Sequence, residues 1–462
     1  MKLLERFAEA LRARKVRLHS AVIISGGEVK EDIYFSSYTP ETLTRMYSAS
    51  KSVAAVAIGK LVGEGKLSLD TRVVDIFRDR FDMSGVDPLL AEQTVREMLT
   101  MTTCYSGPTY SIKRKDWLAS YFEGKATHPA NTVWYYDSSG SYVIGAITQH
   151  LTGKDFVEYL RPEFDIMGIS KGIYSLKGPD GEAWASSGVM ATITDLAKIA
   201  YLLLKGGKWG DKQLIPEEFA RDAISPLKNN ADTVAVHRFN VGYGYQIWSH
   251  PGGAFAFRGL GGQVAVGYPE RDLVIACNSD TSANHNAYDD IFDVIESVIL
   301  PEYPIIAGAV NTIKPLPDVP EGLPRELDGV RYNLSDNPMN ISAITLLSKG
   351  DSYSFEYELE GEARSIAFKP GKEIEITFPE KYWGEMLLDE GGMINYRCRV
   401  ESEWLEPRKL FIRVWAEDLY VGNMTIALAF RDDGMLGVKM EKSAQFFFDG
   451  FEGYATGRRE VK

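Results

Sequence analysis

The chain has 462 residues, of which 45% are hydrophobic and 25% are charged, values typical of a globular protein with two or three domains. The formal net charge of −13, without a dense Lys/Arg run, argues against a nucleic-acid-binding protein. The three cysteines are far apart and odd in number, which argues against a disulfide framework or a cysteine-based metal site.

The beginning of the chain has the apolar spacing of a helix rather than the continuous apolar segment of a signal peptide. No stretch reaches the roughly 18 to 20 apolar residues that a membrane-spanning helix needs. The six histidines have no metal-ligand spacing. We therefore expect a cytoplasmic protein that uses neither a metal nor another cofactor and binds no membrane.

The first reactive motif is Ser48-Ala49-Ser50-Lys51, which lies before an almost wholly apolar run at residues 53–62. That run predicts a helix buried on all sides, and the serine and lysine lie three residues apart, on one face of its first turn. A desolvated lysine has a lowered pKa and can take the proton of a serine hydroxyl. The motif thus predicts a nucleophilic serine, although an N-cap serine on the surface is an open alternative.

A second motif is the aromatic segment 134–136 followed by Ser138, ahead of an apolar helix around residues 143–147. A tyrosine beside a lysine can shuttle a proton between nucleophile and leaving group, and Ser138 would project nearby. Taken alone, the segment fits an aromatic turn that leads into the helix better than it fits a catalytic site.

The spacing of apolar residues along the chain changes near residue 305. Before it, helical patterns at residues 195–205 and 287–300 alternate with strand-like runs such as 273–277. After a proline-bearing stretch at residues 314–320, the pattern alternates with the period of a strand, as at residues 353–359, 373–378, 410–415 and 424–430. We predict a first domain at 1–305, a linker at 306–325 and an all-β domain at 326–462.

Several motifs follow one another in the order of a known superfamily. They are Ser48-x-x-Lys51, residues 94–103, Tyr136-x-Ser138, and residues 151–153, 167–169, 187–197, 242–248 and 259–263. Over residues 15–305 the chain therefore resembles the serine β-lactamase and penicillin-binding-protein superfamily, in particular its class C and esterase-like branch. The resemblance implies an α+β, β-lactamase/transpeptidase-like domain with an antiparallel sheet flanked by helices and an all-helical part. The smaller all-β domain that follows in the sequence is expected to be a barrel, and a lipocalin-like barrel is one candidate.

The resemblance also implies roles for residues. Ser48 would be the nucleophile that forms an acyl-enzyme, Lys51 its general base and Tyr136 the proton relay. The backbone N–H groups of Ser48 and Leu260 would form the oxyanion hole. The residues expected to bind substrate are Ser138, Tyr47, Trp134, Trp248, His250, Arg258 and Gly259.

Two departures from the family pattern bear on the substrate. Ser138 stands where class C enzymes usually carry asparagine. The third motif, usually Lys or His, then Thr or Ser, then Gly, falls on Phe257-Arg258-Gly259 and lacks the first cation. We therefore expect a carboxylesterase, amidase or peptidase that acts on a small ester, amide or peptide, with weak or no β-lactamase activity. The alternative is a non-catalytic or merely acylable protein with a binding role.

Two other serine motifs compete with Ser48. Ser225-x-x-Lys228 precedes polar residues rather than an apolar helix. The segment 168–172 fits the nucleophile-elbow pattern of α/β-hydrolases but lacks the strand before it and the helix after it. The all-β domain could cap the site or mediate assembly into a homo-oligomer, and its sequence does not decide between these roles.

Overall fold

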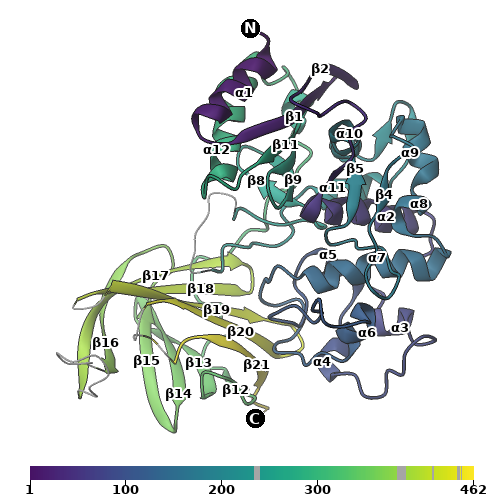
Figure 1. The fold of residues 1–462 in the computed structure, drawn as a ribbon. Coiled ribbons are helices and arrows are strands. Elements are labelled where there is room, and N and C mark those ends of the chain that lie inside the picture. Colours follow the sequence, from purple (N-terminus) through teal and green to yellow (C-terminus); the bar gives the residue numbers. More distant parts are fainter. Residues whose placement is uncertain (234–239, 382–391, 419–420, 445–447, 449, 462) are drawn as a thin grey trace.

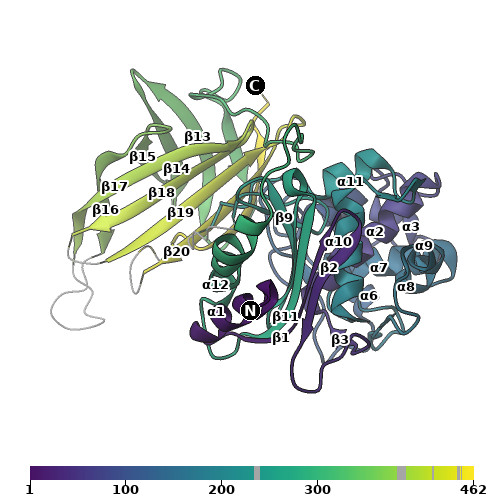
Figure 2. The ribbon, with the colours of Figure 1, turned by 90° about the horizontal axis from the view of Figure 1, so that it is seen from above.

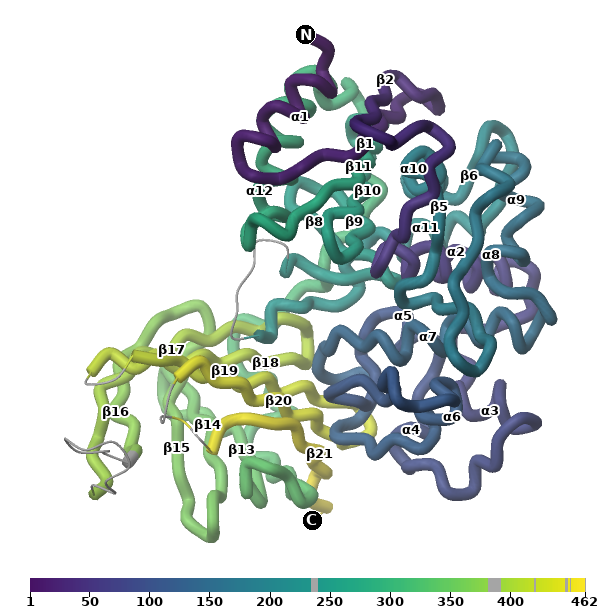
Figure 3. Tube along the Cα trace, in the orientation of Figure 1, coloured from purple at the N-terminus to yellow at the C-terminus, as the bar shows by residue number. Residues whose placement is uncertain are grey.

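The computed structural model describes residues 1–233, 240–381, 392–418, 421–444, 448 and 450–461. An N-terminal body of mixed helices and strands lies beside a C-terminal body of long strands (Figure 1). The tube trace in Figure 3 shows the N-terminus at the outer end of the first body and the C-terminus on the second. Among the described residues, no helix is both long and apolar enough to cross a bilayer.

The N-terminal body contains a six-stranded antiparallel sheet with the order β2-β1-β11-β10-β9-β8. Its strands are β1 (Arg17–Ser25), β2 (Glu28–Tyr34), β8 (Trp248–His250), β9 (Ala254–Gly259), β10 (Gln263–Tyr268) and β11 (Leu273–Asp280). Helices α1 (Leu3–Ala13) and α12 (Ala287–Val294) cover one face (Figure 2). Helix α10 (Ile193–Leu204) packs on the other face, against β1, β10 and β11.

Alternation along each strand explains why the sheet is buried on both faces. In β1, Ala21 and Ile23 pack with α1 and α12, whereas Val22 and Ile24 belong to the core shared with the helical part. Strands β9, β10 and β11 divide in the same way. In β9 the even positions therefore face α12 and the odd positions face the helical part, which sets where the residues of the third motif point.

The helical part surrounds α2 (Ser50–Gly63), whose residues from Ser50 to Leu61 are all buried. Helices α7 (Ser138–Thr152), α8 (Phe156–Tyr159) and α11 (Glu217–Ala223) contact it. A Cβ on Gly59 would lie 2.6 Å from the ring of Phe219, so glycine lets α11 approach α2 closely. The remaining helices are α3 (Val73–Ile76), α4 (Pro88–Ala91), α5 (Val95–Leu99), α6 (Trp117–Phe122) and α9 (Arg161–Met167).

Short elements complete the N-terminal body. Strands β3 (Thr44–Arg45), β5 (Val189–Ala191) and β4 (Tyr174–Ser175) form a small sheet, and β6 (Lys208–Trp209) pairs with β7 (Lys212–Gln213). The short helical turns are η1 (Tyr47–Ala49), η2 (Pro269–Arg271), η3 (Ile295–Ile299) and η4 (Leu300–Glu302).

The C-terminal body is an antiparallel, nearly closed barrel with ten strands in its described ranges, ordered β15-β14-β13-β12-β21-β20-β19-β18-β17-β16. The strands are β12 (Arg331–Leu334), β13 (Ile341–Lys349), β14 (Ser352–Leu359), β15 (Glu362–Phe368), β16 (Ile374–Lys381), β17 (Met393–Glu406), β18 (Lys409–Glu417), β19 (Val421–Phe430), β20 (Met435–Ser443) and β21 (Gly453–Arg459). The inward-facing side chains form a separate hydrophobic core.

Strands β18, β19 and β20 are buried on both faces because the N-terminal body covers their outer side. In β18, Leu410 and Ile412 point into the barrel core, whereas Phe411 packs outward with Val133 of the N-terminal body. A Cβ on Gly437 of β20 would lie 2.2 Å from Oγ1 of Thr132, so at this point the barrel backbone packs directly against a side chain of the N-terminal body. The interface is therefore a packed one and not a loose contact.

The fold class expected from the sequence, a β-lactamase/transpeptidase-like domain followed by a β-barrel, is confirmed. The clearly strand-like runs in the sequence fall short of the eight of a closed barrel, but the sheet has more strands than that. Short or polar strands such as β12 and β21 give little alternation, and they form because their neighbours supply partners on both sides. The domain and linker boundaries remain predictions.

Candidate active site

Ser48 lies in η1, immediately before α2, where the chain is fixed by three neighbouring side chains of the motif. Ser50 Oγ accepts a hydrogen bond from the N–H of Val189, and Ser52 Oγ donates to the carbonyl of Gln246. Lys51 Nζ donates to the carbonyl of Ser186 over 2.7 Å and lies 3.3 Å from Ser48 Oγ. The structure thus brings together the serine and lysine that the sequence paired, with the serine in a tight turn rather than in the first turn of α2.

Lys51 is a buried amine, with 2% of its surface exposed. Burial lowers its pKa from 10.5 to about 7, and attraction to Asp137 opposes this shift only in part. A good part of the Lys51 population is therefore neutral near pH 7 and able to accept a proton. This is the property that a general base for Ser48 requires.

Tyr136 covers Lys51: the ammonium nitrogen lies 4.9 Å from the centre of the tyrosine ring. Burial raises the pKa of Tyr136 to about 12, while a hydrogen bond with Ser48 and the charge of Arg258 act in the opposite direction. The phenol is therefore protonated at neutral pH. Of the two groups beside Ser48, Lys51 is suited to accept a proton and Tyr136 to donate one.

Tyr136 is held by rings on its other side. It stacks on Trp248 of β8 at 5.5 Å and 26°, and Trp134 lies edge-on to Trp248 at 5.7 Å. The edge of Trp134 also contacts Tyr243 at 5.5 Å. Trp134 and Trp248, expected to bind substrate, thus form an aromatic wall beside Tyr136.

The start of α7 fixes the backbone next to Tyr136. Asp137 caps the helix by accepting a hydrogen bond from the N–H of Ser139, and its other oxygen accepts one from Thr103 Oγ1. Burial raises the pKa of Asp137, although these hydrogen bonds favour its charged form. Ser138, the first residue of α7, follows Asp137 directly and is half-buried.

The end of β9 passes close to the serine turn. A Cβ on Gly259 would lie 2.2 Å from the carbonyl oxygen of Met46, so only glycine lets the strand approach so closely. The Gly259 carbonyl accepts a hydrogen bond from the Tyr288 hydroxyl of α12. The next residue, Leu260, has a side chain that is 71% exposed. The segment that carries the expected second oxyanion-hole donor is therefore adjacent to the turn that carries Ser48.

The third motif divides between the two faces of the sheet. Phe257, which stands at the position where the family pattern predicts a cation, is buried in the core of the helical part. Arg258 faces α12, where its guanidinium lies 4.9 Å from the centre of the Trp248 ring and 4.8 Å from that of Tyr288. Because the charge of Arg258 also acts on Tyr136, the arginine lies within electrostatic reach of the site.

Two expected residues, Tyr47 and His250, remain to be placed. The ring of Tyr47 contacts the guanidinium of Arg45 at 4.6 Å, and the two residues help to line a hollow with Leu260 and Gly261. His250 packs against Phe292 of α12 at 4.3 Å, on the outer face of the sheet. A substrate-binding role for His250 stays a prediction.

The competing serines have ordinary structural roles. Ser225 Oγ donates to the carbonyl of Arg221 at the end of α11, and Ser170 Oγ accepts from the N–H of Gly172 in a turn after α9. No group of three or more acidic, histidine or cysteine side chains within the described ranges could hold a metal ion; His237 lies outside them.

Sequence reasoning missed four residues of the site: Ser186, Asp137, Gln246 and Tyr288. Gln246 has a positive φ of 59°, and its side chain accepts from Ser141 Oγ and donates to the Met98 carbonyl. Asp137 is the one that a local signal could have identified, because an aspartate directly before a helix is a typical N-cap. The others reach the site through contacts distant in sequence.

Comparison with known proteins identifies the family and the fold. A sequence model of the family described as Beta-lactamase matches residues 4–297. The 6-aminohexanoate-dimer hydrolase of Paenarthrobacter ureafaciens is 23% identical over 208 residues, which are 40% of this chain and 52% of that protein. The chain thus spans about half the length of this curated relative.

Two solved structures resemble both bodies of the chain. The octameric penicillin-binding protein homologue of Pyrococcus abyssi aligns over 99% of each chain with a TM-score of 0.52 and 19% identity. The structure of SurE with D-Leu aligns over 99% of this chain and 98% of that one, with a TM-score of 0.53 and 16% identity. The fold therefore recurs with its barrel attached, and the match over residues 4–297 shows that the chain belongs to the beta-lactamase family.

Proposed function

We propose that the protein is a serine hydrolase that cleaves an ester or amide bond through an acyl-enzyme on Ser48. The observation that carries this proposal is the buried Lys51 amine, with a pKa of about 7, at 3.3 Å from Ser48 Oγ. A neutral amine at hydrogen-bond distance from a hydroxyl is the arrangement of an activated nucleophile.

In the proposed reaction, Ser48 Oγ bonds to the substrate carbonyl carbon while its proton passes to Lys51. The N–H groups of Ser48 and Leu260 stabilise the negative oxygen, a contribution of about 3 kcal/mol per donor in such sites. The bond to the leaving amine or alcohol then breaks, and Tyr136 gives the leaving group a proton and regains one from Lys51. Water releases the acyl group by the same steps in reverse order.

For the substrate we propose a small ester, peptide or linear amide rather than a β-lactam. Phe257 stands where a cation would meet the carboxylate of a penicillin, and Arg258 is occupied between two aromatic rings. The name of the P. ureafaciens relative points to a linear amide. We also propose a homo-oligomer, as in the octameric relative, which size-exclusion chromatography with light scattering would test.

The test is covalent labelling. We expect a fluorophosphonate and p-nitrophenyl esters to form an adduct on Ser48 of the full chain, located by mass spectrometry of peptides, and Ser48→Ala to be unlabelled while its circular dichroism is unchanged. Ser225→Ala is the matched control and should label as the natural chain does. Labelling of Ser48→Ala would disprove the nucleophile; no adduct and no turnover by the natural chain would favour a binding role.

A further inference from the structure

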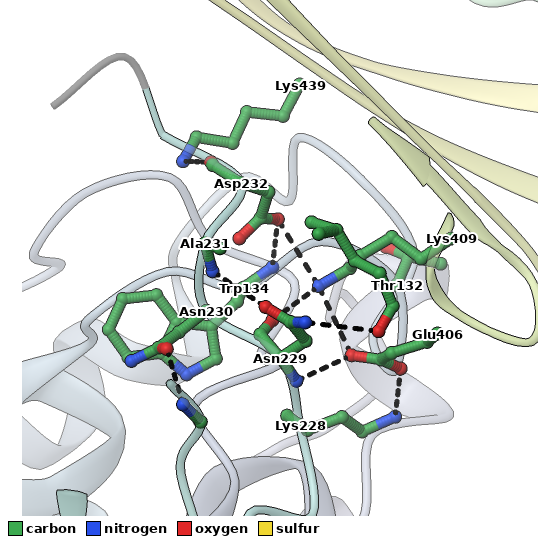
Figure 4. Close-up of polar contacts among 12 residues, drawn as sticks. Thr132, Trp134, Lys228, Asn229, Asn230, Ala231, Asp232, Glu406, Lys409 and Lys439 are labelled. Atoms are coloured by element: carbon green, nitrogen blue, oxygen red, sulfur yellow. Dashed lines mark hydrogen bonds and ion pairs between the residues drawn. The ribbon is translucent and has the colours of Figure 1, made fainter. Parts of the chain in front are cut away.

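Two lysines on the outer face of the barrel enter the N-terminal body (Figure 4). Lys409 of β18 is 2% exposed; its Nζ lies 3.3 Å from Oδ2 of Asp232 and donates to the carbonyl of Asn229 over 2.9 Å. Lys439 of β20 donates to the carbonyl of Asp232 over 2.6 Å. The two lysines of the barrel thus bind one short segment, residues 229–232, both at its backbone carbonyls and at the carboxylate of Asp232.

Asp232 is fully buried, so the ion pair is shielded from water. Burial alone would lower the pKa of Lys409, but attraction to Asp232 and Glu406 outweighs burial and raises it. Loss of either partner of such a pair leaves an uncompensated buried charge, which a protein accommodates only by moving the segment or admitting water. The position of residues 229–232 therefore depends on Lys409.

The carboxylate oxygen of Asp232 that pairs with Lys409 also binds the backbone of the segment that carries Trp134 and Tyr136. Oδ2 of Asp232 accepts a hydrogen bond of 3.2 Å from the N–H of Trp134, two residues before Tyr136. The neighbouring Asn230 accepts the N–H of Gly242 over 2.9 Å, at the start of the segment that carries Tyr243 and Trp248. Both parts of the aromatic wall are thus tied to the segment that the barrel holds.

We infer that Asp232, held by Lys409 of the barrel, is a positioning residue that sets Trp134 and hence Tyr136 against Ser48 and Lys51. The barrel then contributes to catalysis without touching substrate. This inference rests on the proposed function of Ser48, Lys51 and Tyr136. It differs from simple adhesion between two domains, because adhesion affects stability but not the rate of the chemical step.

The experiment compares acylation by a fluorophosphonate in the full chain for Lys409→Met, Lys409→Arg and Val414→Ala. Val414 is a buried residue on the inner face of the same strand, so Val414→Ala destabilises the barrel without touching Asp232. All variants are measured well below their melting temperatures. We expect Lys409→Met to lower the maximal acylation rate by about 10- to 100-fold with little change in the half-saturating probe concentration. Lys409→Arg should retain most of the rate, and Val414→Ala all of it.

A second readout is the pH at which the acylation rate is half-maximal. If Tyr136 no longer covers Lys51, water reaches the amine and the midpoint should move to higher pH in Lys409→Met but not in Val414→Ala. If Lys409→Met does not fold, Asp232→Ala replaces it, because this variant removes the acceptor of the Trp134 backbone N–H while Lys409 keeps Glu406 as its partner; the expectation is the same.

The outcomes separate the two proposals. A folded Lys409→Met, or Asp232→Ala, that acylates at the natural rate with an unchanged midpoint overturns the positioning role and leaves the serine hydrolase intact. An equal loss in Val414→Ala also overturns it, because the loss would then reflect stability alone. Failure of the natural chain to acylate at Ser48 removes the proposed function itself.

Discussion

The pH dependence of acylation follows from the burial of Lys51. Only the neutral amine can take the proton of Ser48, and with a pKa of about 7 the neutral fraction is about 10% at pH 6, half at pH 7 and about 90% at pH 8. The rate of Ser48 acylation should therefore rise about tenfold from pH 6 to pH 8 and then level off. A lysine with an ordinary pKa would instead give a rate that is still rising at pH 9.

The assay is stopped-time labelling with a fluorophosphonate between pH 5.5 and 9.5, corrected for hydrolysis of the probe. Stability gives an independent measure, because the unfolded lysine binds more protons than the native one between pH 7 and 10.5. The natural chain should therefore gain stability relative to Lys51→Met as the pH rises, by about 2 kcal/mol from pH 7 to 9, with a slope that approaches about 1.4 kcal/mol per pH unit above pH 8. Ser48→Ala, which keeps the lysine, should show the same gain. A flat rate profile, or a stability difference that does not vary with pH, would refute the assignment of Lys51 as a buried neutral base.

Three other changes test different parts of the structure. Tyr136→Phe removes the hydroxyl that donates the proton and should lower ester turnover by about 10²- to 10⁴-fold with the fold intact; equal turnover would remove Tyr136 from the mechanism. Gly259→Ala places a Cβ 2.2 Å from the carbonyl of Met46, so the end of β9 must move and turnover should fall by about 10²-fold, whereas normal turnover would mean that Leu260 supplies no oxyanion-hole donor. Truncation after Pro315 uncovers Val133 and removes the cation that pairs with Asp232, so we expect a folded but less stable and poorly active protein, measured by thermal melting and labelling; unchanged activity would contradict any influence of the barrel on the site.

The parts of the site that the sequence predicted are those encoded locally. Ser48 and Lys51 are three residues apart on an apolar segment, so their proximity needs only the first turn of α2 and the turn before it. Tyr136 was harder to predict from spacing, because its position over Lys51 depends on the packing of α7 against α2. Its aromatic neighbours and the resemblance to a family, rather than spacing, identified it.

The contacts that the sequence did not predict depend on long-range pairing. Lys409 and Lys439 occupy alternate positions of strands whose other face is apolar, a pattern that usually places lysines in water. They are buried because another domain covers that face, and nothing within β18 or β20 indicates this. The face that His250 takes could not be predicted for a related reason: it is set by the pairing of β8 with β9, and α12 covers it.

The chemistry of the site and the attachment of the barrel have one physical requirement in common. The pKa of Lys51 is lowered by burial, so it depends on keeping water from the amine; on one side the amine is covered by Tyr136, which is backed by Trp248 and Trp134. An aromatic wall built from residues before α7 and from an edge strand has few covalent constraints, so its position depends on what anchors its backbone. Asp232 provides such an anchor through the N–H of Trp134, and the charge of Asp232 is in turn compensated by Lys409. A change that weakens the barrel contact should therefore alter the proton affinity of Lys51 before it alters the fold.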